Sequence, residues 1–207
     1  GTNFTGSLLV GHSTTGTIDN AYYNTALGIS TLDALTTADY NVAIGYNAGT
    51  AITTGSSNIL IGSNAGDALV GGASNIAIGR QALSTEDGHG RNVAIGHATL
   101  ENQNAGADAY NIAIGYTAGI SISTGAENVL IGGKAGDALT TGNQNVALGH
   151  LALSTEDSGN KSIAIGYYAL YSQNNDADNY NVAIGHSAGT AMTTGDSNTL
   201  IGGLAGD

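Results

Sequence analysis

Histidine and tyrosine recur at one point of a short repeated motif, where they are the side chains best suited to contact a ligand. Each follows the glycine that ends a five-residue motif such as Asn41-Val42-Ala43-Ile44-Gly45. Rings repeated on an exposed sheet could bind sugars through their faces, although such a column more often stabilises neighbouring chain segments by stacking. The rings that could contact a ligand are Tyr46, His97, Tyr116, His150, Tyr167 and His186.

Two pairs of adjacent carboxylates are the candidates for acid–base chemistry. They are Glu86-Asp87 and Glu156-Asp157, each of which follows a Ser-Thr dipeptide. Glycoside hydrolysis uses two carboxyl groups about 5 to 9.5 Å apart, so such a pair could serve. A repeated acidic turn is more often a solvated loop, and the chain has no phosphate-binding loop and no nucleophile motif. We therefore expect no catalytic residues and no enzymatic activity.

Metal sites are weakly indicated. The nearest histidines of the ring column lie two repeats apart, about 10 Å at ordinary strand spacing, whereas zinc ligands lie about 2 Å from the ion. Asp108, Asp176 and Asp178 could bind Ca²⁺ weakly, because Ca²⁺ prefers carboxylate oxygens. The calcium-binding nonapeptide pattern is absent, so we expect no cofactor and no metal ligands beyond this weak Ca²⁺ candidate.

Charge and composition exclude several partners. The 207 residues contain 16 acidic and 4 basic side chains, for a net charge of −12. Nucleic acids and anionic membrane surfaces bind Lys/Arg-rich surfaces, so neither is expected as a partner. The chain has no cysteine, and without a run of about 18 apolar residues no membrane insertion is expected.

The repeat is the dominant feature of the sequence. Successive copies of the motif begin 17 positions apart in nine of the eleven cases and 19 positions apart in the other two. Four copies form a longer, 70-residue period, visible in the Tyr-Asn pairs that begin at Tyr40, Tyr110 and Tyr180. The twelve copies begin at Ser7, Asn24, Asn41, Asn58, Asn75, Asn92, Asn111, Asn128, Asn145, Ser162, Asn181 and Asn198.

A 17-residue period predicts an all-β solenoid. It is too short for helical repeats, which need about 33 to 47 residues, and the β-branched motif between Asn and Gly is typical of a short strand. Equivalent strands of successive coils would stack in parallel about 4.8 Å apart, giving a rod about 58 Å long. We expect one repeat solenoid over residues 1–207, a fragment of a longer protein.

The alternation within the strand predicts which side chains face inward. We expect the first and third apolar residues, such as Val42 and Ile44, to fill the lumen. The middle residue would then face outward, yet it is always Ala or Leu. A long exposed apolar stripe usually marks an interface, although another part of the same chain could cover it. The stripe includes Leu60, Ala77, Ala94, Ala113, Leu130, Ala147, Ala164, Ala183 and Leu200.

Three further positions in each coil have predicted roles. The leading Asn suits a ladder of stacked side-chain amides or an Asx turn. The glycine after the strand suits a corner with positive φ. Small residues seven positions after the leading Asn, such as Ala48 and Ala65, predict a second, shorter strand that closes the coil.

The motif Asn-Val-Ala-Ile-Gly-x-x-Ala resembles the head repeats of YadA-like trimeric autotransporter adhesins. The coils with Thr-Gly-x-x-Asn before the next strand are also similar to repeats of bacteriophage tail fibres from cyanobacterial and other marine phages. The resemblance covers Ser7 to Asp207. It implies a left-handed parallel β-roll that forms a homotrimer, with the Ala/Leu stripe at the trimer interface. The coils are longer than those of adhesin heads.

These features give three alternative functions. The first is a non-catalytic fibre shaft that attaches to a host-surface glycan or protein receptor, on a virion tail fibre or a bacterial cell surface. The second is a purely structural extracellular spacer, and the third, more distant, is an ice-binding solenoid, which the irregular threonine column containing Thr37 and Thr54 disfavours. Receptor contact would use the ring column and the inserts that lengthen two coils, namely Asn102, Gln103, Gln173 and Asn174.

Overall fold

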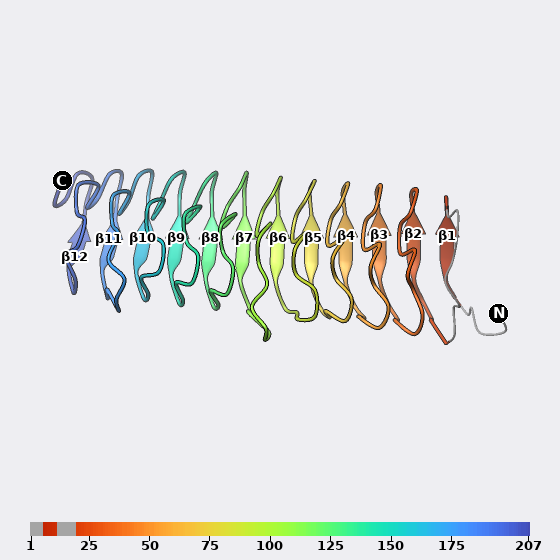
Figure 1. Ribbon diagram of the computed structural model, residues 1–207. Coiled ribbons are helices and arrows are strands. Elements are labelled where there is room, and N and C mark those ends of the chain that lie inside the picture. Colours follow the sequence, from red (N-terminus) through yellow and green to blue (C-terminus); the bar gives the residue numbers. More distant parts are fainter. Residues whose placement is uncertain (1–5, 12–19) are drawn as a thin grey trace.

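The computed structural model describes residues 6–11 and 20–207, which form a straight rod of stacked coils (Figure 1). Each coil contributes one three-residue strand, and consecutive strands pair in parallel to form one sheet in sequence order. The predicted all-β parallel solenoid is confirmed. Its twelve strands are β1 (Leu8–Val10), β2 (Thr25–Leu27), β3 (Val42–Ile44), β4 (Ile59–Ile61), β5 (Ile76–Ile78), β6 (Val93–Ile95), β7 (Ile112–Ile114), β8 (Val129–Ile131), β9 (Val146–Leu148), β10 (Ile163–Ile165), β11 (Val182–Ile184) and β12 (Thr199–Ile201).

The strands remain in register across both lengths of coil. Val42 pairs with Ile59 at the end of a shorter coil, and Val93 pairs with Ile112 in the same way at the end of a longer one. The extra residues of the longer coils are therefore accommodated outside the sheet.

The predicted second strand is wrong for the part of the chain that the structure describes. The chain turns after each strand, and φ is +56° at Asn47 and +58° at Gly49, values that extended strands do not adopt. Backbone hydrogen bonds still join successive coils here, as from the Gly49 N–H to the Ala65 carbonyl at 3.0 Å. This side of the solenoid is a stack of hydrogen-bonded turns.

The buried asparagines form the predicted amide ladder. Asn41 Nδ2 donates to the Gly55 carbonyl at 2.9 Å, which ties the two ends of its own coil together. The Asn41 side-chain oxygen accepts from the backbone N–H and from Nδ2 of Asn58 in the next coil, at 2.9 and 3.0 Å. The ladder thus supplies partners for polar groups that would otherwise be buried without them.

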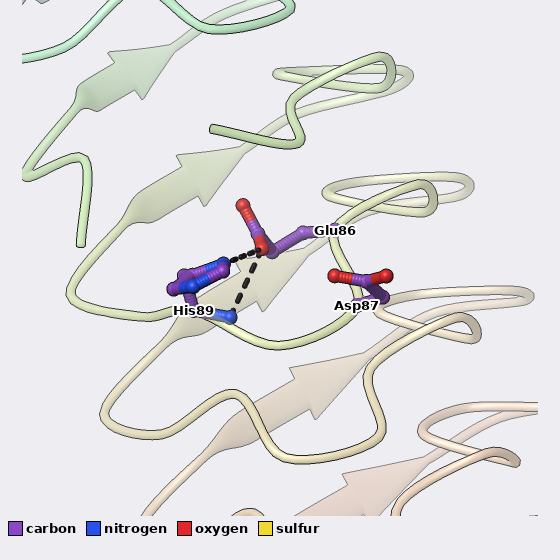
Figure 2. A group of neighbouring side chains, drawn as sticks. All are labelled: Glu86, Asp87 and His89. Atoms are coloured by element: carbon purple, nitrogen blue, oxygen red, sulfur yellow. Dashed lines mark hydrogen bonds and ion pairs between the residues drawn. The ribbon is translucent and has the colours of Figure 1, made fainter. Parts of the chain in front are cut away.

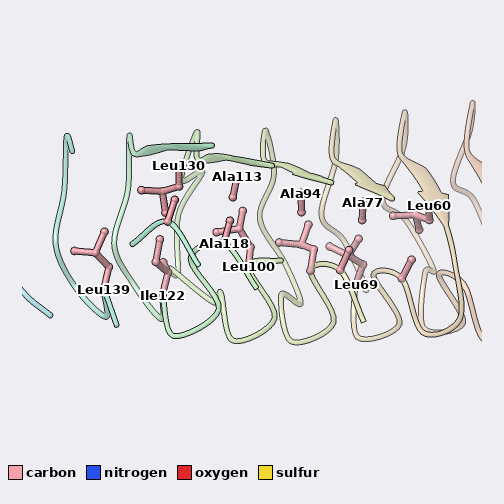
Figure 3. Packing of buried hydrophobic residues seen from close by; sticks show 14 of the residues in the cluster. Leu60, Leu69, Ala77, Ala94, Leu100, Ala113, Ala118, Ile122, Leu130 and Leu139 are labelled. Atoms are coloured by element: carbon pink, nitrogen blue, oxygen red, sulfur yellow. The ribbon is translucent and has the colours of Figure 1, made fainter. Parts of the chain in front are cut away.

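The predicted direction of the strand side chains is wrong. The middle residue of each strand faces the lumen, as Figure 3 shows for Leu60, Ala94 and Leu130. The flanking residues, mostly Val and Ile, face outward and are half-buried or exposed. The leading Asn, the middle residue and the corner glycine occupy alternate positions, as Asn41, Ala43 and Gly45 do, so they point to the same side of the strand. Because the amide ladder is internal, all three lie inside. The expected interface residues are therefore in the core: Leu60, Ala77, Ala94, Ala113, Leu130, Ala147, Ala164 and Ala183 are fully buried, and Leu200 packs against the same core from the last coil.

The lumen is filled by complementary side chains. A Cβ atom added to Gly66 would lie 2.8 Å from a methyl group of Leu60, so the large strand residue occupies space that this glycine leaves free. Where the strand residue is Ala77 or Ala94, the turn position equivalent to Gly66 holds a buried leucine, Leu83 or Leu100. In the coils that begin at Asn41, Asn111 and Asn181 both positions are small. Leucines of the neighbouring coils fill that space, since a Cβ atom at Gly49 would lie 2.7 Å from Leu60 and 3.0 Å from Leu32.

The corner glycines have the predicted conformation. Gly45 has φ of +134°, and a Cβ atom there would lie 2.6 Å from the carbonyl oxygen of Gly62 in the next coil. Both the positive φ and this close approach exclude larger residues.

Candidate functional site

The outward face of the sheet is the most distinctive surface of the rod. The first and third strand residues form two aliphatic columns along it, and they include Ile59, Ile112 and Ile184 among the exposed large apolar residues. Tyrosines flank these columns on both sides in some of the coils: Tyr23, Tyr40, Tyr110 and Tyr180 precede strands, and Tyr46, Tyr116 and Tyr167 follow them. In one coil the order along the chain is Tyr110, Ile112, Ile114 and Tyr116, with both rings exposed.

The predicted ring column exists, and five of its six rings stack on one another. Tyr46 is exposed, and its neighbours in the column, Ile29 and Ser63, carry no ring. His97 and Tyr116 have ring centroids 5.4 Å apart with an interplanar angle of 16°. His150, Tyr167 and His186 form a continuous stack with spacings of 5.6 and 5.1 Å. Within a stack, the face of each ring is turned toward a neighbouring ring. The ring edges along the side of the stack are therefore left for contact with a ligand. The geometry therefore favours coil stabilisation over face-on sugar binding within the stacks.

The two inserts present only part of their predicted contact surface. Asn102 and Asn174 are exposed. Gln103 and Gln173 are fully buried, so their predicted role in receptor contact is wrong. They occupy the lumen position that an apolar side chain such as Ile122 takes in other coils, and alignment of the coils on the turn leucine or glycine three residues earlier could have revealed this.

Each buried glutamine lies one coil beyond a buried glutamate at the same lumen position. Glu156 Oε2 accepts from Gln173 Nε2 at 2.9 Å and from Asn179 Nδ2 at 3.1 Å. Its Oε1 accepts from the Gly159 N–H at 2.9 Å. The Glu156 carboxylate is therefore well supplied with donors.

Glu86, the equivalent residue of the preceding block, has fewer donors. Oε1 accepts from the backbone N–H of His89 at 3.0 Å, whereas Oε2 is buried without a hydrogen-bond partner (Figure 2). Ala109 stands where the other block has Asn179, so one donor is missing. Burial raises the pKa of Glu86, opposed by the His89 backbone hydrogen bond and by the charge of the His89 imidazole.

The carboxylate pairs do not form a glycosidase-like site. Glu86 and Glu156 point into the lumen and have no exposed surface, whereas a polysaccharide would need both carboxyl groups on one accessible face. Ligand atoms of Glu86, Asp87 and His89 lie within 4.8 Å of one another, as do those of Glu156, Asp157 and Asp176. In the first group, Glu86 Oε1 already accepts a backbone hydrogen bond and lies 3.5 Å from His89 Nδ1.

The aspartates considered for Ca²⁺ already have partners. Asp108 pairs with Arg91 and Asp178 with Lys161, each at 2.6 Å. Asp176 accepts from the Ser158 hydroxyl at 2.7 Å, and this hydrogen bond lowers the pKa of Asp176. A bound cation would have to compete with the Arg91 and Lys161 charges at the first two positions.

No protein-family model, curated protein or solved structure matches the chain. Within the described ranges, 6–11 and 20–207, no helix has the length and apolar character needed to span a membrane.

Proposed function

We propose that this chain is a segment of a non-catalytic fibre shaft that associates with copies of itself and supports attachment to a host surface. The observation that carries the proposal is the outward face of the sheet. Its two columns are aliphatic along the stacked coils except at Thr25 and Thr199, and exposed apolar patches of this extent usually mark interaction surfaces. The rod shape supplies reach, since each coil adds about 4.8 Å.

The interface of this proposal differs from the one expected from the sequence. It consists of the side chains that flank each middle Ala or Leu, most of them Val and Ile, because the middle residues fill the lumen of their own chain. A flat sheet face with β-branched side chains can pack against the same face of another copy without changing either backbone. The choice of a homotrimer, and of a virion tail fibre or a bacterial cell surface as the extracellular location, follows from the resemblance to adhesin and tail-fibre repeats.

One observation favours a second function, that of a spacer without a receptor of its own. Apart from Tyr46, the rings that could have bound a receptor face-on stack against one another between coils. A column whose ring faces are used internally needs no external ligand to account for it.

Native mass, measured by light scattering after size exclusion, tests the self-association. We expect a mass of about three chains for the unmodified protein. Ile112→Asp places a charge on the outward face and should shift the protein to a single chain while its circular dichroism stays unchanged. Ala107→Asp, on an exposed insert of the preceding coil, is the matched control and should leave the mass unchanged. A folded, unmodified protein that runs as a single chain would overturn the proposal.

A further inference from the structure

A polar groove of about 350 Å³ crosses the surface where four successive coils lead into β8, β9, β10 and β11. Apart from one alanine, the side chains that line it are charged or carry amides. They are Glu127, Asn143, Gln144, Asn160, Lys161 and Asp178. The groove spans three coil steps, or about 14 Å at the spacing of parallel strands.

The equivalent surface in the preceding 70-residue block lacks most of these side chains. Ser57, Ala73, Ser74 and Gly90 stand in place of Glu127, Asn143, Gln144 and Asn160. The backbone is the same in both blocks, since φ is +65° at Ser57 and +61° at Glu127, and +61° at Ser74 and +59° at Gln144. The coil therefore folds with short side chains at positions 57 and 74, so folding alone does not account for Glu127 and Gln144. Asn143 and Asn160 do contribute to folding, because their Oδ1 atoms accept from the backbone N–H of Ala126 and of Asn143 at 2.9 and 2.8 Å and so join successive coils.

The polar groups of the groove hold one another in place. Gln144 Nε2 donates to Glu127 Oε2 at 2.8 Å, and Asn143 Nδ2 donates to Asn160 Oδ1 at 3.2 Å. At the far end Lys161 Nζ contacts Asp178 Oδ2 at 2.6 Å and donates to the Tyr180 hydroxyl at 3.1 Å. These contacts fix the amide and carboxylate planes and so reduce the ordering cost of binding a ligand.

The chemistry of the groove selects a class of ligand. An apolar molecule would find almost no apolar wall, and a phosphate would find one ammonium group that is already paired with a carboxylate. Amide and carboxylate groups side by side offer donors and acceptors at short intervals, which matches the adjacent hydroxyl groups of a sugar. The groove length suits several sugar units in a row.

We propose that this groove binds a neutral oligosaccharide, with Glu127 and Gln144 as its principal contacts. The inference deepens the attachment part of the proposed function by naming a ligand class and a site. Its biological meaning rests on the proposed function. Sugar binding itself does not depend on self-association, because all the residues that line the groove belong to a single chain.

A titration of the ¹⁵N-labelled protein followed by NMR tests the site directly. The probes are maltotriose, cellotriose and N,N′,N″-triacetylchitotriose, with 3′-sialyllactose and inorganic phosphate as charged comparisons. We expect at least one neutral trisaccharide to shift the amide signals of Glu127 and Gln144 in a saturable way. Failure of all three neutral sugars to bind, or binding confined to the charged probes, would overturn the proposal.

The chain supplies its own matched variants. The double variant Glu127→Ser, Gln144→Ser installs the residues of the preceding block, so it should fold normally and bind the same sugar at least about tenfold more weakly, as loss of several hydrogen bonds predicts. The triple variant Ser57→Glu, Ala73→Asn, Ser74→Gln transfers both principal contacts and Asn143 to the preceding block and should create a second set of shifts around residue 57. Unchanged affinity in the double variant would also overturn the proposal. Native mass is measured on the same samples, so loss of sugar binding and loss of self-association are distinguished.

Discussion

Glu86 and Glu156 occupy equivalent lumen positions but differ in their donors. Glu156 has Asn179 beside it, whereas Glu86 has Ala109 and an oxygen without a partner. The ionised form of Glu86 is therefore less favoured in the folded chain than in the unfolded chain, so the pKa of Glu86 is raised, chiefly by burial. The equivalent glutamines differ as well, because Gln173 Nε2 donates to Glu156 whereas Gln103 Nε2 donates to the Ser123 carbonyl. Two buried glutamates of a duplicated block thus have unequal hydrogen bonding.

Stability should depend on pH through Glu86. Because its pKa is higher in the folded chain than in the unfolded chain, its stabilising contribution is full below the unfolded pKa and is lost as pH rises through the folded pKa. Glu86→Gln removes this loss, so the melting temperature of the variant should exceed that of the unmodified protein increasingly from about pH 4 toward neutral pH. Thermal melts followed by circular dichroism over this range measure the difference, and a gap that narrows toward neutral pH would contradict the prediction.

Asn179→Ala makes the second block resemble the first. It removes one of the two side-chain donors to Glu156 Oε2, and a buried polar group that loses a partner costs about 1–3 kcal/mol. Chemical denaturation at neutral pH should show a loss of this size. Asn174→Ala, on the exposed part of the same insert, is the control and should cost less than about 0.5 kcal/mol.

At the scale of the strand, neighbouring side chains differ sharply in their environment. Leu130 is fully buried and fills the space above Gly119 and Gly136, whereas Val129, adjacent in β8, faces outward. Leu130→Ala should cost about 2–5 kcal/mol because it leaves a cavity in a close-packed lumen. Val129→Ala, measured by the same denaturation on single chains kept dilute, should cost clearly less. Equal losses would mean that the two sides of the strand are equally buried.

Alternation alone could not determine which side of the strand faces inward. The motif is apolar at three consecutive positions, so hydrophobicity predicts a short buried strand but not its orientation. The deciding signal was the leading asparagine. If the asparagines form an internal amide ladder, the residue two positions later points inward as well. This places Ala43 inside and Val42 outside. Lumen volume gives the same answer, because so short a coil has room for Ala, or for Leu opposite Gly.

The sequence predicted the coil, its register and its corner glycines because these depend on local chemistry that repeats. It did not predict the buried glutamines, because a polar residue next to an insert is usually solvated. Gln103 and Gln173 are buried because their position is determined by the turn leucines at 100 and 170, three residues earlier. The groove was missed for another reason: Glu127 and Lys161 are far apart in sequence and come together only when successive coils stack.

For the whole molecule, the 70-residue block is the natural unit of packing. From Leu60 onward, successive coils follow a fixed order of lumen side chains, in which a strand leucine lies between turn glycines, as Leu130 does between Gly119 and Gly136. Stability in such a stack is approximately a sum of terms within coils and between nearest neighbours. A deletion that preserves this order should therefore be tolerated better than a shorter one that breaks it.

Deletion of residues 111–180 joins Tyr110 to Asn181 and retains the order, because Ala183 and Gly189 replace Ala113 and Gly119. We expect a folded rod about 19 Å shorter, at four strand spacings, with a melting temperature close to that of the full chain. Small-angle scattering measures the length. Deletion of residues 111–127 removes only one coil, but it places Leu100 directly against Leu130 without Gly119 between them.

Overpacking of this kind costs about 1–3 kcal/mol or more, so the one-coil deletion should melt at a lower temperature than the four-coil deletion, although it keeps more of the chain. Gly119 contacts both leucines, and a Cβ atom there would lie 2.8 Å from Leu130 and 3.1 Å from Leu100. Leu130→Ala in the shortened chain should therefore restore stability, even though the same change destabilises the full-length chain. A loss of stability from Leu130→Ala in both backgrounds would show that coil order is not what limits the stack.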